Sequence, residues 1–400
     1  MAQKVPNLLS VKFLTGRIVS QILSMLQIRL KFIVPLICLS QIFCSVSGVY
    51  VRSDQIDETR QTGAELQSSQ RLILIGDAGK AENEQPLWQV LRKTVAENPG
   101  NTRVIYLGDN LYEAGLPAPA ENDPDYEKYA GVLQTQIDAA AGARQIIFVP
   151  GNHDWANRKE IGKTRILAQQ SYVKAQQAEF FPANGCPDVH ALHLNENNLA
   201  LFLDSQAITD LFANRTFDST NCENKTVEQL SKQLARLTAG FRAENKTVMI
   251  LAHHPLRTIG PHGGYFSWHH HVFPVYNYNP YVPLPIVASM IVWGRQLGWL
   301  TSTDISHKDY QRYIEFVDQI IKGLPNVIIA AGHDHNIQIL QSNKADGLLH
   351  IVSGTGSKSD IVFEHDDSLL ATTEPGMIIM DFLPNGKHAI KLRLADGRDF

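Results

Sequence analysis

The sequence predicts an α/β fold, in which strands and helices alternate along the chain. Short β-branched and aliphatic runs, typical of strands buried on both faces, recur at residues 71–75, 103–107, 145–149, 199–203, 248–252, 326–331 and 348–352. Helical patterns lie between them, near residues 84–97, 126–141, 160–180, 226–242 and 308–322. This alternation is typical of sheets covered by layers of helices, and we expect it to form one main domain over residues 71–400.

A further pair of strands is expected near the end of the chain, over residues 376–383 and 388–394. The turn Pro384-Asn385-Gly386 separates the two runs, and an Asn-Gly step between alternating runs favours a tight hairpin. We expect this C-terminal hairpin (376–394) to form the closing edge of the second sheet and to have a structural role.

The composition is that of an ordinary globular protein. Of the 400 residues, 44% are hydrophobic and 19% are charged, which excludes a collagen-like or mostly disordered chain. The formal net charge of −4 excludes a broad basic surface of the kind that binds nucleic acid, so no nucleic-acid partner is expected.

The N-terminal region has a different composition from the rest of the chain. Residues 1–53 contain no Asp or Glu, and five basic residues precede an apolar run over 32–51. This pattern predicts a signal peptide over residues 1–48, for which Met25 would be a compact start. An uncleaved anchor is the alternative, because about 20 apolar residues can just span a bilayer. We therefore expect a secreted or periplasmic protein, or one held at a membrane by this segment, with a polar linker over 49–70.

Two cysteines, Cys186 and Cys222, lie outside the predicted leader. In an exported chain they can form a disulfide, whereas two unrelated thiols remain the alternative.

Polar clusters follow five of the predicted strands directly. They are Gly76-Asp77, Gly108-Asp109 with Tyr112, Gly151-Asn152-His153-Asp154, His253-His254, and Gly332-His333-Asp334-His335. In open α/β sheets ligands bind beyond the carboxyl ends of the strands, so we expect the clusters to meet at one rim. Imidazole and carboxylate together suit Fe, Zn or Mn, and one carboxylate can bridge two ions for displacement at phosphorus.

The order of these residues resembles the calcineurin-like metallophosphoesterases, and most closely the low-molecular-mass, tartrate-resistant purple acid phosphatases. Gly79 stands where the wider superfamily usually has His, and Tyr112 is the tyrosine that purple acid phosphatases use instead. The resemblance covers about residues 71–357. It implies a four-layer α-β-β-α sandwich of two mixed sheets flanked by helices, and hydrolysis of small phosphate monoesters at acid pH by attack of a metal-bound hydroxide.

The resemblance also implies the roles of individual residues. One ion, Fe(III), would be held by Asp77, Asp109, Tyr112 and His335. A second, divalent ion (Fe, Zn or Mn) would be held by Asp109 as a bridge and by Asn152, His253 and His333. Three further residues would complete the site: His153 as general acid, Asp154 as its orienting or supporting partner, and His262 as a contact to phosphate.

Two other functions remain open from the sequence. A related enzyme could cleave phosphodiesters or nucleotides with Mn or Zn, and a non-catalytic surface protein could retain the fold.

Residues 257–310 form an insertion that is long for a compact phosphatase. It contains His269-His270-His271 and the apolar stretch 284–300. We interpret the insertion as a lid over the metal rim, in which 284–300 contacts a membrane; a core helix packed on the sandwich is the alternative. The three consecutive His are not expected to bind one metal ion together, because neighbouring side chains point in different directions.

Overall fold

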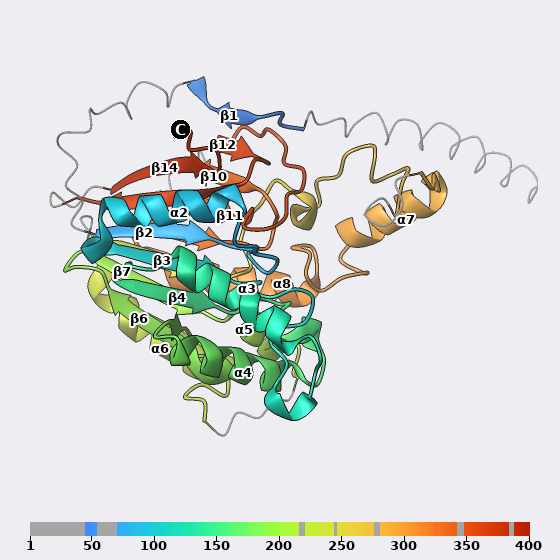
Figure 1. The fold of residues 1–400 in the computed structure, drawn as a ribbon. Helices are drawn as coiled ribbons and strands as arrows, with labels where there is room; N and C mark the ends of the chain where they lie inside the picture. The colour runs from blue at the N-terminus through green and yellow to red at the C-terminus, as the bar shows by residue number, and fades with distance from the viewer. Residues whose placement is uncertain are drawn as a thin grey trace, which may run out of the picture. The chain divides into compact units, whose positions relative to one another are not determined.

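The computed structural model describes residues 45–53, 70–215, 221–243, 246–275, 281–341, 348–383 and 388–400. Within residues 45–400 two mixed sheets pack face to face and helices cover their outer faces (Figure 1). The predicted four-layer α/β sandwich is thereby confirmed.

The six-stranded sheet has the order β14-β13-β2-β3-β4-β5. Its parallel strands are β2 (Gln70–Ile75), β3 (Thr102–Leu107), β4 (Gln145–Val149) and β5 (Glu179–Phe180). The antiparallel pair β13 (Gly376–Phe382) and β14 (His388–Leu394) completes it beside β2. The C-terminal hairpin therefore closes the sheet that contains the first strands of the domain, and our assignment to the second sheet was wrong. Its turn, 384–387, lies outside the described residues.

The eight-stranded sheet has the order β1-β12-β10-β11-β9-β8-β7-β6. Parallel pairing joins β7 (Asn198–Leu203), β8 (Thr247–Leu251), β9 (Asn326–Ala331) and β11 (Leu348–Ser353). Antiparallel strands complete both edges: β1 (Val49–Val51), β12 (Ser368–Thr372), β10 (Ile337–Gln341) and β6 (Val189–His193). Strand β1 thus forms at the start of the predicted linker, and residues 54–69 of that linker lie outside the described part of the chain.

Alternation along each strand divides the core into three apolar layers. Leu72 and Leu74 of β2 point inward and pack with Met249 and Leu251 of β8 between the two sheets. Their neighbours in sequence point outward, under helices α2 (Pro86–Glu97), α3 (Tyr126–Ala139) and α4 (Gly162–Ala175) on the six-stranded sheet. Helices α5 (Ser205–Phe212), α6 (Val227–Thr238) and α8 (Lys308–Ile321) cover the eight-stranded sheet. Because both sheets are held on both faces, the loops at the strand ends have a fixed base.

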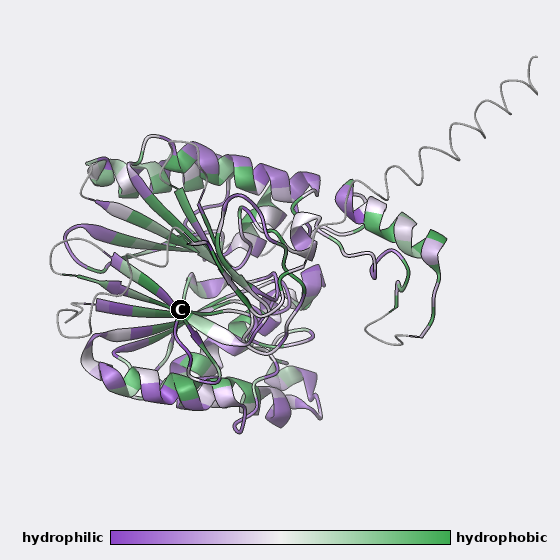
Figure 2. Cartoon of the chain, turned by 90° about the horizontal axis from the view of Figure 1, so that it is seen from above, coloured by the Kyte–Doolittle hydropathy of each residue, from purple (hydrophilic) through white to green (hydrophobic). Residues whose placement is uncertain are grey.

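Helix α7 (Pro285–Gln296) lies outside these layers (Figures 1 and 2). Ile286 and Met290 on its outer face are 78% and 64% exposed. The alternative of a core helix in this stretch was therefore wrong. None of the helices among the described residues is both long and apolar enough to cross a bilayer.

A disulfide joins Cys186 and Cys222, which are separated by 36 positions in the chain. Of the two alternatives that the sequence left open, the disulfide is therefore correct and the two unrelated thiols are not.

Candidate metal centre

The loops that follow β2 and β3 turn sharply and carry Asp77 and Asp109. Both residues lie in the left-handed region, with φ of 61° and 50°, which non-glycine residues seldom adopt. Gly108 is required before Asp109, because its φ is 86° and a Cβ there would lie 2.7 Å from Cγ of His253. The tight turns place both carboxylates, each nearly inaccessible to solvent, at the same rim of the sandwich.

Four polar side chains from the loops after β3, β4, β8 and β9 converge on one point. Nε2 of His253 lies 3.0 Å from Oδ1 of Asn152, 3.3 Å from Oδ1 of Asp109 and 3.2 Å from Nδ1 of His333. Nδ1 of His253 faces the carbonyl of Leu107 at 2.9 Å. Since a carbonyl only accepts, the ring proton is assigned to Nδ1, and Nε2 is left as an acceptor.

The same reasoning applies to His333. Its Nε2 lies 2.7 Å from the carbonyl of Thr303, so Nε2 carries the proton and Nδ1 is the acceptor. Two unprotonated imidazole nitrogens therefore face each other, with an amide oxygen and a carboxylate oxygen beside them. Four acceptors around one point repel one another unless a cation lies among them, so the donor set fits a metal ion.

A second group of donors lies next to the first. The hydroxyl of Tyr112 donates to Oδ1 of Asp77 at 2.9 Å and lies 3.3 Å from Nε2 of His335, which is 3.5 Å from the same Asp77 oxygen. Ligand atoms of Asp77, Asp109 and His253 all lie within 4.8 Å of one another. The residues expected to hold two ions are thus brought together, with Asp109 beside both groups.

His153 lies on the wall of the site, and its Nε2 is 3.9 Å from Oδ2 of Asp109. Its Nδ1 faces the carbonyl of Glu113 at 2.7 Å and the amide of Asn157 at 3.1 Å. The same Asn157 accepts a hydrogen bond of 2.9 Å from Nδ2 of Asn152, which turns Oδ1 of Asn152 toward His253. Asn157 was missed in the sequence, where it looks like an ordinary loop residue.

Asp154 does not orient His153, and that part of the prediction was wrong. Among the described residues its carboxylate accepts hydrogen bonds from the backbone of Gly151, Asn110 and Leu111, and from the side chain of Asn110. Burial, and then the nearby carboxylate of Asp109, raises the pKa of Asp154 to about 7. Asp154 therefore ties the loop after β4 to the loop after β3.

The insertion contributes to the site from the opposite side. Nδ1 of His262 lies 3.0 Å from Oδ1 of Asp304, a buried carboxylate that also accepts two hydrogen bonds of 2.8 and 2.7 Å from Arg295. The ring of His262 lies 4.1 Å from the ring of His333, measured between centroids. This places His262 beside the metal-ligand candidates, whereas the sequence did not reveal Asp304, Arg295 or the carbonyl of Thr303.

Lys358, in the loop after β11, was also missed. Its ammonium nitrogen lies 3.3 Å from the centroid of the Tyr112 ring, and burial lowers the pKa of this lysine. The preceding Ser357 donates to the carbonyl of Asp77 at 2.7 Å. The strand end at Ser353-Gly354 was the only signal that this loop belongs to the rim.

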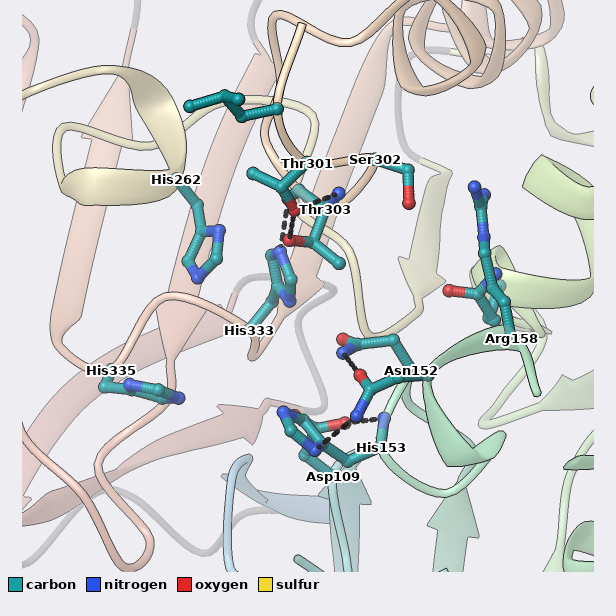
Figure 3. A pocket seen from close by; sticks show the side chains of 13 residues that line it. Asp109, Asn152, His153, Arg158, His262, Thr301, Ser302, Thr303, His333 and His335 are labelled. Carbon is teal, nitrogen blue, oxygen red and sulfur yellow. Dashed lines mark hydrogen bonds and ion pairs between the residues drawn. The ribbon is translucent and has the colours of Figure 1, made fainter. Parts of the chain in front are cut away.

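A cavity of about 340 Å³ opens between these elements (Figure 3). It is lined by the ligand candidates Asp109, Asn152, His333 and His335, by His153, Asn157, Arg158, Gln206 and His262, and by residues 300–303.

A two-sheet sandwich with carboxylates, imidazoles and a tyrosine gathered at its strand ends defines the class of metallophosphoesterases. The chain belongs to the calcineurin-like phosphoesterase family, which it matches over residues 70–337. This is a metal-dependent family, in agreement with the donor set described above.

Individual relatives are distant. The chain is 24% identical to purple acid phosphatase 17 of Arabidopsis thaliana over 226 residues, which are 54% of this chain and 61% of the relative. Among solved structures it is similar to GAP50, described as the anchor in the inner membrane complex of Plasmodium, with 16% identity, a TM-score of 0.47 and coverage of 83% and 86% of the two chains. It is also similar to purple acid phosphatase PPD1 from yellow lupin (Lupinus luteus), with 16% identity, a TM-score of 0.45 and coverage of 84% and 53%.

Proposed function

We propose that this protein is a binuclear-metal acid phosphatase that hydrolyses phosphate monoesters. The observation that carries the proposal is the arrangement of two adjacent donor groups on either side of Asp109, one of which contains a tyrosine hydroxyl. Fe(III) is assigned to Asp77, Asp109, Tyr112 and His335, because charged oxygens favour the harder ion. A divalent ion is assigned to Asp109, Asn152, His253 and His333, which offer neutral amide and imidazole donors. Bound there, the two ions would polarise the phosphate and make water available as a nucleophile at low pH.

The protein's own side chains handle the leaving group and the phosphate. Because Nδ1 of His153 is held by the carbonyl of Glu113, Nε2 is the nitrogen left to give a proton to the departing alcohol. Nδ1 of His262 is held by Asp304, so its Nε2 is left to contact a phosphate oxygen. Asn157 positions Asn152 by accepting its hydrogen bond, and its own Nδ2 donates to the same Glu113 carbonyl that holds His153.

The test combines metal analysis and a visible spectrum of the purified protein with a panel of phosphate monoesters and diesters from acid to neutral pH. We expect two ions per chain, iron among them, a purple colour that is lost in Tyr112→Phe, and fastest hydrolysis of monoesters at acid pH. A colourless iron-loaded protein that prefers diesters or nucleotides would instead identify a Mn- or Zn-dependent phosphodiesterase. Failure of the two-metal protein to hydrolyse any ester would identify a non-catalytic member of the fold.

We also propose that the insertion 257–310 is a lid and that α7 contacts a lipid surface. The only charged residue of the helix, Arg295, points inward to Asp304, and no Asp or Glu occurs between Lys246 and Thr303. The outer face is apolar, which suits a helix lying in a membrane interface. Sedimentation with phosphatidylcholine vesicles should be lost in the double variant Ile286→Glu/Met290→Glu and retained in Leu167→Glu, a control on α4. Equal sedimentation of all three proteins would contradict this contact.

The compartment is proposed to be extracytoplasmic, since the disulfide Cys186–Cys222 is of a kind that persists in oxidising environments. Sequencing of the mature N-terminus would show whether the predicted leader (1–48) is removed. Residues 1–44 of this leader lie outside the described part of the chain.

A further inference from the structure

One end of the cavity is built from residues that the proposed metal chemistry does not use. Arg158 and Ser302 lie on the right in the view of Figure 3, while His262 and His335 lie on the left. Gln206, from the first turn of α5, also lines the cavity. Asp109 is the only carboxylate among the described residues that line the cavity.

An unusual turn of the backbone places Arg158 at the wall of the cavity. Residues 156, 157 and 158 have φ of 50°, 52° and 65°, so three consecutive non-glycine residues lie in the left-handed region. The turn is fixed by hydrogen bonds from Asn157 N to Asn152 O (2.8 Å) and from Trp155 Nε1 to Asp204 Oδ2 (2.8 Å). The chain therefore reverses directly after the ligand candidate Asn152, and the Arg158 side chain is only 9% exposed.

The guanidinium of Arg158 is paired with a carboxylate through Nε, whereas its two Nη groups have no such partner among the described residues. Its Nε lies 2.9 Å from Oδ1 of Asp210, and among the described residues neither Nη group donates a hydrogen bond. Arg215 also lies beside Asp210, at 3.9 Å, so two arginines share that carboxylate, and Asp309 is a second acidic group near Arg158. Nε2 of Gln206, a residue only 1% exposed, makes no hydrogen bond of good geometry among the described residues, although the side chain lies beside the same Asp210 carboxylate. Buried donors of this kind normally have a partner, and here the open side is the cavity.

We propose that Arg158 and Gln206 form a second anion subsite, which binds a phosphate group carried by the leaving group of the substrate. The inference rests on the proposed phosphatase activity and names its substrate class as compounds with two phosphate groups. His153, Asn157 and Arg158 follow one another along the same loop. All three line the same cavity, so a leaving group that takes its proton from His153 lies in the cavity that Arg158 also lines.

The reaction itself is hydrolysis and needs no further reactant. Water forms the new P–O bond at the phosphate beside Asp109, the bond from phosphorus to the leaving oxygen breaks, and that oxygen takes a proton from His153. The products are inorganic phosphate and an alcohol that still bears the second phosphate. A guanidinium fixed by Asp210 binds that phosphate through its Nη groups, as charge-assisted hydrogen bonds.

The experiment compares kcat/KM for propane-1,3-diol bisphosphate with kcat/KM for propyl phosphate. Wild-type protein should prefer the bisphosphate by about tenfold to a hundredfold, the range expected for one charge-assisted contact. Arg158→Gln should remove most of that preference, while Arg215→Gln, which changes the other arginine beside Asp210 and does not line the cavity, should keep it. Gln206→Glu leaves Arg158 in place and should also remove the preference, because it adds a negative charge.

The outcomes separate this inference from the proposed function. If the two-metal protein hydrolyses propyl phosphate but shows no preference for the bisphosphate, or if Arg158→Gln and Gln206→Glu both retain the preference, the second subsite is refuted and the phosphatase proposal stands. If neither ester is hydrolysed, the proposed function itself fails. Metal content and the unfolding midpoint of each variant show whether it is folded.

Discussion

The strand-end loops and the insertion 257–310 both contribute to the cavity, but they are stabilised in different ways. The loops after β2, β3, β4, β8 and β9 lie on two sheets that are packed on both faces, and their polar side chains are largely buried. The insertion exposes apolar side chains to solvent and is joined to the site through a few polar contacts, such as Asp304 with Arg295 and His262. The comparison teaches that the packed sheets hold the metal-ligand candidates in position. The insertion is held less tightly, so it can vary and thereby determine which substrates enter the cavity.

The largest effect is expected at the strand ends. Asp109→Ala removes the carboxylate that lies beside both donor groups, so both metal positions should empty. Activity should fall by at least about 10³-fold, since the Lewis acidity of bound ions is worth several kcal/mol. Elemental analysis of the purified variant measures the metals, with the exposed Asp125→Ala as control. Retention of two ions per chain would contradict the bridging role.

A smaller loss is expected from the wall of the site. His153→Ala should keep both metals and slow turnover by about 10²- to 10⁴-fold, most for alkyl phosphates, whose leaving groups need a proton. Rates on alkyl and nitrophenyl phosphates measure the difference, with the distant, exposed His193→Ala as control. Equal slowing of both esters would show that His153 acts in some other way.

Burial below the strand-end loops should also make the free energy of unfolding depend on pH, through the carboxylate of Asp204. Asp204 caps α5, accepts a hydrogen bond from Trp155, and has its pKa raised by burial from 3.8 to about 7. The folded protein therefore binds this proton more tightly than the unfolded chain. The contribution is fully present below pH 3.8 and is lost as the pH rises to about 7, by at most about 1.4 kcal/mol per pH unit.

Urea unfolding of the metal-free protein and of Asp204→Asn, from pH 4 to pH 7, isolates this contribution. The free energy of unfolding of the wild type should decrease with pH relative to that of the variant. A difference between the two proteins that does not change with pH would show that Asp204 is ionised throughout.

The smallest effect is expected in the insertion. Ile286→Glu/Met290→Glu should change the free energy of unfolding by less than about 0.5 kcal/mol per site, because both side chains face solvent. Ile250→Glu, a matched change in the buried strand β8, should destabilise the protein strongly. Similar losses in both variants would mean that α7 packs against the body more closely than its exposure indicates.

The same contrast explains how much the sequence could predict. Strands such as β3 and β4 were visible because a buried strand between helices must be continuously apolar, and the polar residues directly after it mark the rim. The exposure of α7 could not be decided from the sequence, because the same apolar stretch fits a helix that contacts lipid and a helix buried in the core. Asn157 and Arg158 could not be found either, since their positions depend on a left-handed turn that no local pattern indicates.

The hydrogen bond between His333 and Thr303 involves a main-chain carbonyl, which every amino acid at position 303 would supply. Evolution can therefore change the residues of this stretch freely while the proton stays on Nε2 of the histidine. The length of the stretch is a different matter: an insertion or deletion near residue 303 would move the carbonyl, free the imidazole to change tautomer, and alter the nitrogen offered to the metal. Loop length, rather than residue identity, should thus be under selection here.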